Sequence, residues 1–124
     1  MTNNGRLFSG GRNIALKIPP HEFDQTLRFY RDTLGLRQLD DHRPSHVFEF
    51  GANLLWLDRV ETMTHTEIWL ELQTRDTDSA AARLEINGVV RCDTIENLPE
   101  DFNGFWISGP GNIVHLVHGP QQEN

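Results

Sequence analysis

The residues of this chain best suited to metal chemistry are a histidine and a glutamate two positions apart, His65 and Glu67. They open a strand-like run, and residues two apart on a strand share one face of a sheet. An imidazole and a carboxylate on one face supply two ligands for a divalent metal, and a complete site generally needs a third side chain. The competing interpretation is that His65, between Thr64 and Thr66, is a solvated loop residue.

Other common reactive motifs do not occur in the sequence. It contains no glycine-rich phosphate loop, nucleophile elbow or paired-cysteine zinc motif. The single cysteine, Cys92, excludes an internal disulfide and fits a reducing cytoplasm. Because thiol catalysis needs a nearby base and an electropositive setting, we interpret Cys92 as a structural thiol.

Length and charge narrow the class of protein. The chain has 124 residues, which suits one compact domain, and a net charge of −7, which weighs against nucleic acids and anionic membrane surfaces. No segment approaches the roughly eighteen apolar residues of a membrane helix. We expect residues 1–10 to form a flexible tail, and they show no signal-peptide core. These features predict a cytoplasmic protein that binds neither nucleic acid nor membrane.

The elements that position these residues occur twice. Residues 13–18 are echoed 54 positions later (13 to 67), and residues 53–57 are echoed 59 positions later (53 to 112). A repeat of this size predicts two copies of one supersecondary unit, each too small to bury its own core. Residues that face inward where the copies meet can line a shared cavity.

The first copy reads as a strand, a helix and three strands. The aliphatic run 13–18 stops at Pro19-Pro20, and apolar residues at helical spacing predict a helix over 22–34, ended by Gly35. Three short strands are predicted at 37–41, 46–50 and 53–58.

The second copy repeats this order after a polar connector at 59–66. A strand at 67–73 leads into a helix that Thr77 or Asp78 can cap and that runs to about Ile86, with a small-residue face suited to packing on a sheet. The last strands are predicted at 89–95, 104–108 and 113–117.

Several of these segments match a known family. Phe29-Tyr30 precedes Leu34-Gly35-Leu36 at the end of the first helix, and Gly111-Asn112 leads into the last strand. With 13–18, 27–36 and 105–116, the chain resembles the vicinal oxygen chelate superfamily (glyoxalase I, bleomycin resistance proteins, extradiol dioxygenases) over about residues 12–118. The resemblance implies an α+β fold. Two βαβββ modules, about 12–58 and 67–118, form a curved mixed sheet around a cavity in a single domain, with the helices on the outer face. It also implies a homodimer.

The resemblance further implies where a metal would bind. In metal-dependent members, four strand positions face the cavity and usually hold histidine or glutamate. Here they hold Asn13, Trp56, Glu67 and His115. Asn13 and Trp56 depart from the pattern, and tryptophan cannot ligate a metal. Glu67 and His115, with His65 as a third ligand, would have to hold any manganese, iron, nickel or zinc. Alternatively, Glu67 and His115 form a hydrogen-bonded or ionic pair in the cavity.

Strand alternation extends the cavity-facing set. Its proposed ligand-binding members are Asn13, Lys17, Trp56, Trp69 and Glu71. Aromatic side chains with a few polar anchors are typical of small-molecule sites, and they suit a planar or cationic ligand. The alternatives are that both tryptophans only pack and that Lys17 pairs with Glu71.

Three functions fit these observations. The first, which we favour, is a small-molecule binder with a degenerate metal site and no cofactor, like the bleomycin resistance branch, whose groove involves a second subunit. The second is a divalent-metal lyase, isomerase or dioxygenase of the glyoxalase type. The third is a metal-free enzyme that uses Glu67 and His115 as an acid–base pair.

Overall fold

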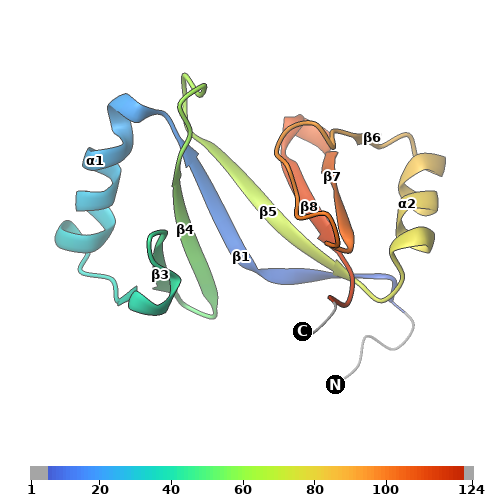
Figure 1. Ribbon diagram of the computed structural model, residues 1–124, viewed down its shortest axis with the longest axis horizontal. Helices are drawn as coiled ribbons and strands as arrows, with labels where there is room; N and C mark the ends of the chain where they lie inside the picture. Colours follow the sequence, from blue (N-terminus) through green and yellow to red (C-terminus); the bar gives the residue numbers. More distant parts are fainter. Residues whose placement is uncertain (1–5, 122–124) are drawn as a thin grey trace. The chain divides into compact units, whose positions relative to one another are not determined.

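The computed structural model describes residues 6–121, which divide into two compact units. We call residues 12–69 the first unit, and residues 6–11 with 70–121 the second unit. Each unit has one α-helix, α1 in the first and α2 in the second (Figure 1). The first unit begins where the first predicted module begins, and the division falls after Trp69 rather than in the connector 59–66.

The first unit follows the predicted order of a strand, a helix and three strands. Its strands lie in the order β2-β3-β4-β1, with β1 and β4 parallel and the other neighbours antiparallel. Its elements are β1 (Phe8–Ile18), α1 (Pro20–Arg28), the π-helical turn η1 (Phe29–Thr33), β2 (Gln38–Leu39), the 3-10 turn η2 (Asp40–His42), β3 (His46–Phe50) and β4 (Asn53–Arg59). The residues of β1 before position 12 belong to the second unit.

The first helix changes type along the predicted span 22–34. Pro20 starts α1, where its missing N–H leaves no bond unmade. After Arg28 the chain continues as η1, in which the N–H of Leu34 donates to the carbonyl of Phe29 at 2.9 Å. Gly35 follows with φ of 65°, the left-handed conformation that ends many helices, as predicted.

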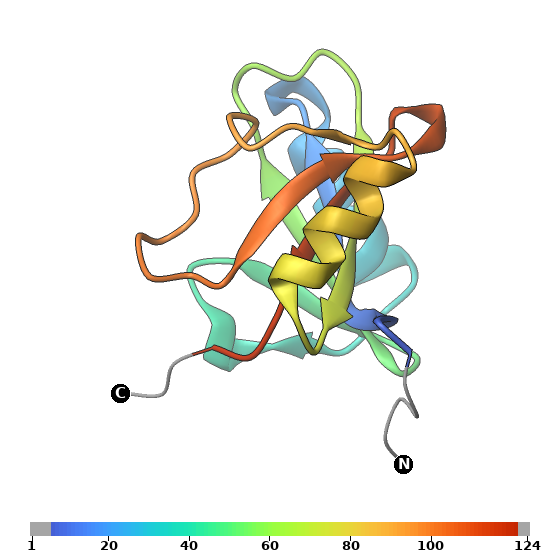
Figure 2. The same ribbon diagram turned by 90° about the vertical axis from the view of Figure 1, so that its right-hand side faces the viewer.

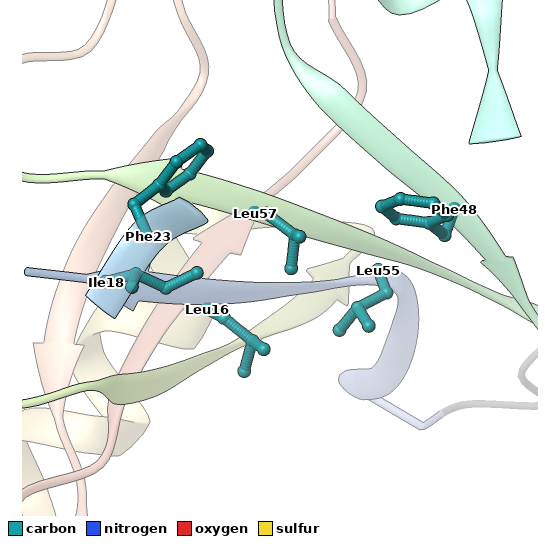
Figure 3. Packing of buried hydrophobic residues seen from close by; sticks show 6 residues of the cluster. All are labelled: Leu16, Ile18, Phe23, Phe48, Leu55 and Leu57. Carbon is teal, nitrogen blue, oxygen red and sulfur yellow. The ribbon is translucent and has the colours of Figure 1, made fainter. Parts of the chain in front are cut away.

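The core of the first unit lies between α1 and the sheet. Alternation directs one set of side chains from β1 and β4 toward Phe23 of α1 (Figure 3). This set and its neighbours, all buried, are Leu16, Ile18, Phe23, Phe48, Leu55 and Leu57. The opposite side we call the helix-free face of the first unit. Its residues from β1 and β4 include Asn13, Ala15, Lys17, Trp56 and Asp58.

The second unit repeats the pattern from a strand that starts in the first unit. Its strands lie in the order β5-β8-β7-β6, with β5 and β8 parallel and β7 antiparallel to β6 and β8. Its elements are β5 (Glu67–Thr74), α2 (Thr77–Ile86), β6 (Val90–Arg91), β7 (Gly104–Ser108), the 3-10 turn η3 (Pro110–Asn112) and β8 (Val114–His118). The predicted repetition of βαβββ is therefore confirmed.

Helix α2 packs on one face of these strands, alongside β7 in Figure 2. Its fully buried Ala80 contacts a cluster that includes Phe105 and Val117, which confirms the predicted small-residue face. The predicted cap at Thr77 or Asp78 is wrong by at least one position. Asp76 caps the helix, and its carboxylate accepts a hydrogen bond from the N–H of Ser79 at 3.1 Å.

Two predicted strands are much shorter than expected. The span 37–41 gives way after Leu39 to η2, and the span 89–95 keeps only Val90–Arg91. In the span 89–95, hydrogen bonds to a side chain and within a turn replace the hydrogen bonds between strands. The carboxylate of Asp93 accepts the N–H of Trp106 at 3.0 Å, and the N–H of Ile95 turns back to the carbonyl of Cys92 at 2.9 Å.

The N-terminal segment is part of the fold from an earlier residue than predicted. A flexible tail over 1–10 is wrong for Phe8 to Gly10, which belong to β1, whereas residues 1–5 lie outside the described residues. Leu7 is 5% exposed and joins the core of the second unit, and Phe8 packs against it. Within residues 6–121, no helix is long and apolar enough to span a membrane.

Candidate functional site

Trp56 of β4 lies on the helix-free face of the first unit. Its indole N–H donates a hydrogen bond to Oδ1 of Asn13 at 2.7 Å. The imidazole of His42, in η2, meets the indole edge-on, with ring centroids 5.2 Å apart and planes at 85°. The ring is thus held by two neighbours while it stays partly exposed.

His42 is a site residue that the sequence did not reveal. It stands in the charged segment 40–43, yet only 28% of its side chain is exposed. Its Nδ1 is 2.9 Å from Oδ1 of Asp41, yet this buried nitrogen makes no aligned hydrogen bond among the described residues. Strand alternation could not locate His42, because η2 interrupts it.

Lys17, the only lysine in the sequence, is buried on the same face. Its ammonium forms an ion pair with Asp58 at 2.8 Å and lies 4.4 Å from the centroid of the Trp69 ring. The lysine side chain is 6% exposed and that of Asp58 is 30% exposed. A charge this far from water needs such partners, so Lys17 ties β1 to β4 and to the indole of Trp69.

Glu67 lies at the start of β5 between two side chains of the first unit. The indole N–H of Trp69 donates to its Oε1 at 3.0 Å, and Nε2 of His65 is 3.3 Å from its Oε2. His65 and Glu67 do therefore come together as predicted. His65 is 70% exposed, however, which fits the solvated alternative.

The predicted orientation of His115 is wrong. In the antiparallel register of β7 and β8, Ile107 pairs with His115 and Phe105 pairs with Val117, so all four side chains share one face. That face is covered by α2, because Phe105, Ile107 and Val117 belong to the core beneath it. The Nδ1 of His115 is 3.0 Å from the carbonyl oxygen of Ile113. The helix-free face of β8 carries Leu116 and His118 instead.

Glu71 meets His118 on the helix-free face of the second unit. Their side chains, 12% and 16% exposed, approach to 2.8 Å between Oε2 and Nε2. The hydrogen bond that His118 donates to Glu71 raises the pKa of the imidazole above its ordinary value, against the opposing effect of burial. Gly11 of β1 makes room for the pair, because a Cβ there would overlap the Glu71 carboxylate. The alternative pairing of Lys17 with Glu71 stays a prediction.

Cys92 has the character of a quiet thiol. Burial raises the pKa of its thiol, and the negative charge of Asp93 acts in the same direction. Since the thiolate is the nucleophile, a raised pKa lowers reactivity at neutral pH.

The similarity of this chain to proteins of known structure is seen in the fold. No family model matches the sequence, and no curated protein matches it either. The solved structures that resemble it include the Mn(II)-bound glyoxalase from Novosphingobium aromaticivorans, with a TM-score of 0.62 and 16% identity. The match covers 95% of this chain and 42% of the glyoxalase chain, so this chain spans less than half of that protein.

Two further structures match along most of both chains. Methylmalonyl-CoA epimerase from Mycobacterium tuberculosis has a TM-score of 0.58 and 16% identity, over 95% of this chain and 92% of its own. A glyoxalase/bleomycin resistance protein/dioxygenase superfamily member from Vibrio splendidus 12B01 has a TM-score of 0.56 and 8% identity, over 90% of this chain and 100% of its own. They confirm the fold of the vicinal oxygen chelate superfamily. Identities this low show the fold alone.

The resemblance of the sequence to the vicinal oxygen chelate superfamily implied a metal, and the donor groups at the expected positions do not fit one. At the expected positions, the Asn13 oxygen accepts the Trp56 N–H, and Trp56 offers no ligand atom. Glu67 is engaged by Trp69 and His65, while His115 lies on the α2 side of its strand. Among residues 6–121, no group of three histidine, cysteine, aspartate or glutamate side chains could hold a metal ion.

Proposed function

We propose that this protein binds a small organic molecule on the helix-free face of the first unit, against the indole of Trp56. The observation that carries the proposal is the way this ring is held. Asn13 binds its N–H, and His42 buttresses its edge. A partly exposed aromatic ring fixed in advance loses little conformational entropy when a ligand stacks on it. The fold is one whose solved members include a glyoxalase and methylmalonyl-CoA epimerase.

Glu67, an acidic residue of the same unit, favours a planar ligand that carries a cationic or strongly donating group. Its side chain is 33% exposed, so its carboxylate is open to a ligand. An indole face attracts cations as well as flat apolar rings. Trp69 is 4% exposed and lies beneath the Lys17 ammonium, so we assign it a packing role that positions Glu67. The assignment of Glu71 to the ligand stays a prediction.

Tryptophan fluorescence tests this function directly. We would titrate the protein with N-methylquinolinium, a planar cation, and with 2-naphthoate, a planar anion of similar size. We expect saturable quenching by the cation, retained in Trp106→Phe and lost in Trp56→Phe. Trp106 is a suitable control because it is buried in β7 and donates its N–H to the carbonyl of Glu96. Equal quenching in both variants would count against Trp56 as the contact surface.

The alternative function is a divalent-metal lyase, isomerase or dioxygenase, which the Mn(II)-bound glyoxalase among the similar structures favours. The mismatch of donor groups is the argument against it. Metal content after purification with manganese, iron, nickel or zinc separates the two functions. Stoichiometric metal that disappears in Glu67→Gln or His115→Ala would support the enzyme, and in that case the binding proposal would fail.

We also propose that the protein is a cytoplasmic homodimer. The single cysteine supports a reducing compartment. Sedimentation equilibrium at micromolar concentration tests the dimer, since a mass near 14.3 kDa, that of one chain, would contradict it.

A further inference from the structure

A hollow of about 270 Å³ lies in the second unit. It opens where Ser9 of β1 and the end of β5 meet the end of β8. Its lining consists of Ser9, Gln73, Thr74, Arg75 and His118, together with Gly119 and Pro120.

The charge of this lining is unusual for an acidic chain. The sequence carries a net charge of −7, yet no aspartate or glutamate is among the described residues that line the hollow. Its ionisable side chains are Arg75 and His118 alone. Hydroxyl and amide groups both donate and accept hydrogen bonds, whereas the guanidinium of Arg75 only donates, so the hollow is better suited to an acceptor than to a donor.

His118 contributes positive charge to the hollow because it pairs with Glu71. Its Nε2 is 2.8 Å from Glu71, and this hydrogen bond raises the pKa of the imidazole, so a larger share is protonated at neutral pH. The compensating carboxylate of Glu71 belongs to the pair rather than to the lining. Nδ1 of His118 is 3.3 Å from the carbonyl of Gly119. Both ring nitrogens therefore have partners, so the imidazolium acts on the hollow through its charge, which Glu71 partly offsets, and not through a hydrogen bond.

Arg75 supplies directional donors. One of its guanidinium nitrogens, Nη1, donates to the carbonyl of Arg6 at 2.7 Å, which fixes one edge of the group. A guanidinium has five N–H donors in a planar fork, so others remain for an oxyanion. The nearest negative group along the chain, Asp76, accepts hydrogen bonds from Ser79 as the cap of α2, and its charge also interacts with that of Arg75.

We propose that this hollow is a second binding site, which takes a small oxyanion, a carboxylate or a phosphate group, between Arg75 and His118. Thr74 and Ser9 add hydroxyl groups to its wall. The site stands in the second unit and does not depend on the function proposed for Trp56. It would let the protein hold an acidic metabolite or the acidic part of a larger molecule.

Titration with inorganic phosphate and with acetate, followed by amide chemical shifts of the full chain, tests the proposal. We expect saturable shifts at Ser9, Thr74 and Gly119, and phosphate should bind more tightly than acetate if charge dominates. Arg75→Gln should weaken binding by about tenfold, the loss expected for one charge-assisted pair. Arg83→Gln, which removes a charge from α2 outside the lining, should change affinity by less than about twofold.

The pH dependence of affinity gives a second measurement. Binding of acetate, whose own charge is constant near neutral pH, should weaken as the pH rises and His118 loses its proton, and this dependence should be reduced in His118→Gln, which keeps a donor for Glu71. Tighter binding of acetate than of phosphate would identify a carboxylate site. Shifts that do not saturate, or that respond equally to Arg83→Gln and Arg75→Gln, would overturn the proposal.

Discussion

The two units carry ion pairs of opposite polarity at corresponding places. In the first unit the cation, Lys17, is on the first strand of the module and the anion, Asp58, is near the end of the last strand. In the second unit the anion, Glu71, is on the first strand and the cation, His118, ends the last strand. Lys17 and Glu71 are 54 positions apart (17 to 71), the spacing of the repeat. Both pairs close to 2.8 Å.

This difference shows which parts of a repeated module can change. The side chains that form the buried clusters under α1 and α2 are apolar in both units, because each core must exclude water. The polar positions on the other face need only a complementary partner, so their charges can exchange. One result is a permanent pair built on lysine. The other is a pair built on histidine, whose charge depends on pH.

The largest expected effect comes from breaking the lysine pair. Lys17→Ala should lower the free energy of unfolding by about 3 kcal/mol, because it removes the partner of Asp58 and the cation over Trp69. Urea unfolding followed by circular dichroism measures this. The matched control is Arg12→Ala, an exposed cation on the same strand, which should cost less than about 0.5 kcal/mol. Similar losses in both variants would mean that burial of Lys17 has no energetic consequence.

The histidine pair can be disturbed without touching either partner. Gly11→Ala places a methyl group against the carboxylate of Glu71 and should cost about 2 kcal/mol, the usual scale of overpacking. Gly10→Ala is its control, since a Cβ at that neighbouring position meets nothing within 4 Å. Chemical unfolding of both variants gives the comparison. Equal stability of Gly11→Ala and Gly10→Ala would contradict the close contact between β1 and the Glu71 side chain.

The starts of the two helices sharpen the comparison further. α2 has a side-chain cap in Asp76, whereas α1 begins at Pro20 without one. Asp76→Ala should therefore lower the urea midpoint, by less than Gly11→Ala does, while the exposed Asp24→Ala in α1 should leave it nearly unchanged. The hydrogen bonds from Ser79 lower the pKa of Asp76. The contribution of this cap to the free energy of unfolding should therefore be lost as the pH falls through the lowered pKa of the folded state.

The smallest expected effect is the pH dependence of the His118–Glu71 pair. The pKa of His118 is raised in the folded state, so the pair's contribution is complete below the unfolded value of about 6.5 and is lost as the pH rises through the folded value. Relative to His118→Gln, the wild type should lose less than about 1 kcal/mol between about pH 6 and pH 8.5. Unfolding curves at both values measure the difference. If the wild type gained stability relative to His118→Gln at the higher pH, the effect would have the opposite sign and would contradict a stabilising His118–Glu71 ion pair.

Much of the fold could be predicted because it depends on local patterns. The apolar spacing of Phe23 and Leu27 predicted the first helix, and Gly35 takes the expected left-handed conformation after it. The strands at 46–50 and 104–108 have the predicted bounds. These features follow from residue type and period. The strands at 37–41 and 89–95 were overestimated, because side chains and turns can take over backbone hydrogen bonds that a sequence pattern assigns to a ladder.

The candidate site likewise has features that the sequence predicts and features that depend on the tertiary structure. The sequence by itself determined that Lys17, Trp56 and Glu67 stand on strands of a twice-repeated βαβββ fold. Only the tertiary structure decided that His118 rather than His115 shares a face with Glu71, because a shift of one residue reverses every side chain of a strand. It also decided that His42 meets Trp56, because a contact across 14 positions (42 to 56) depends on how η2 folds back beside β4.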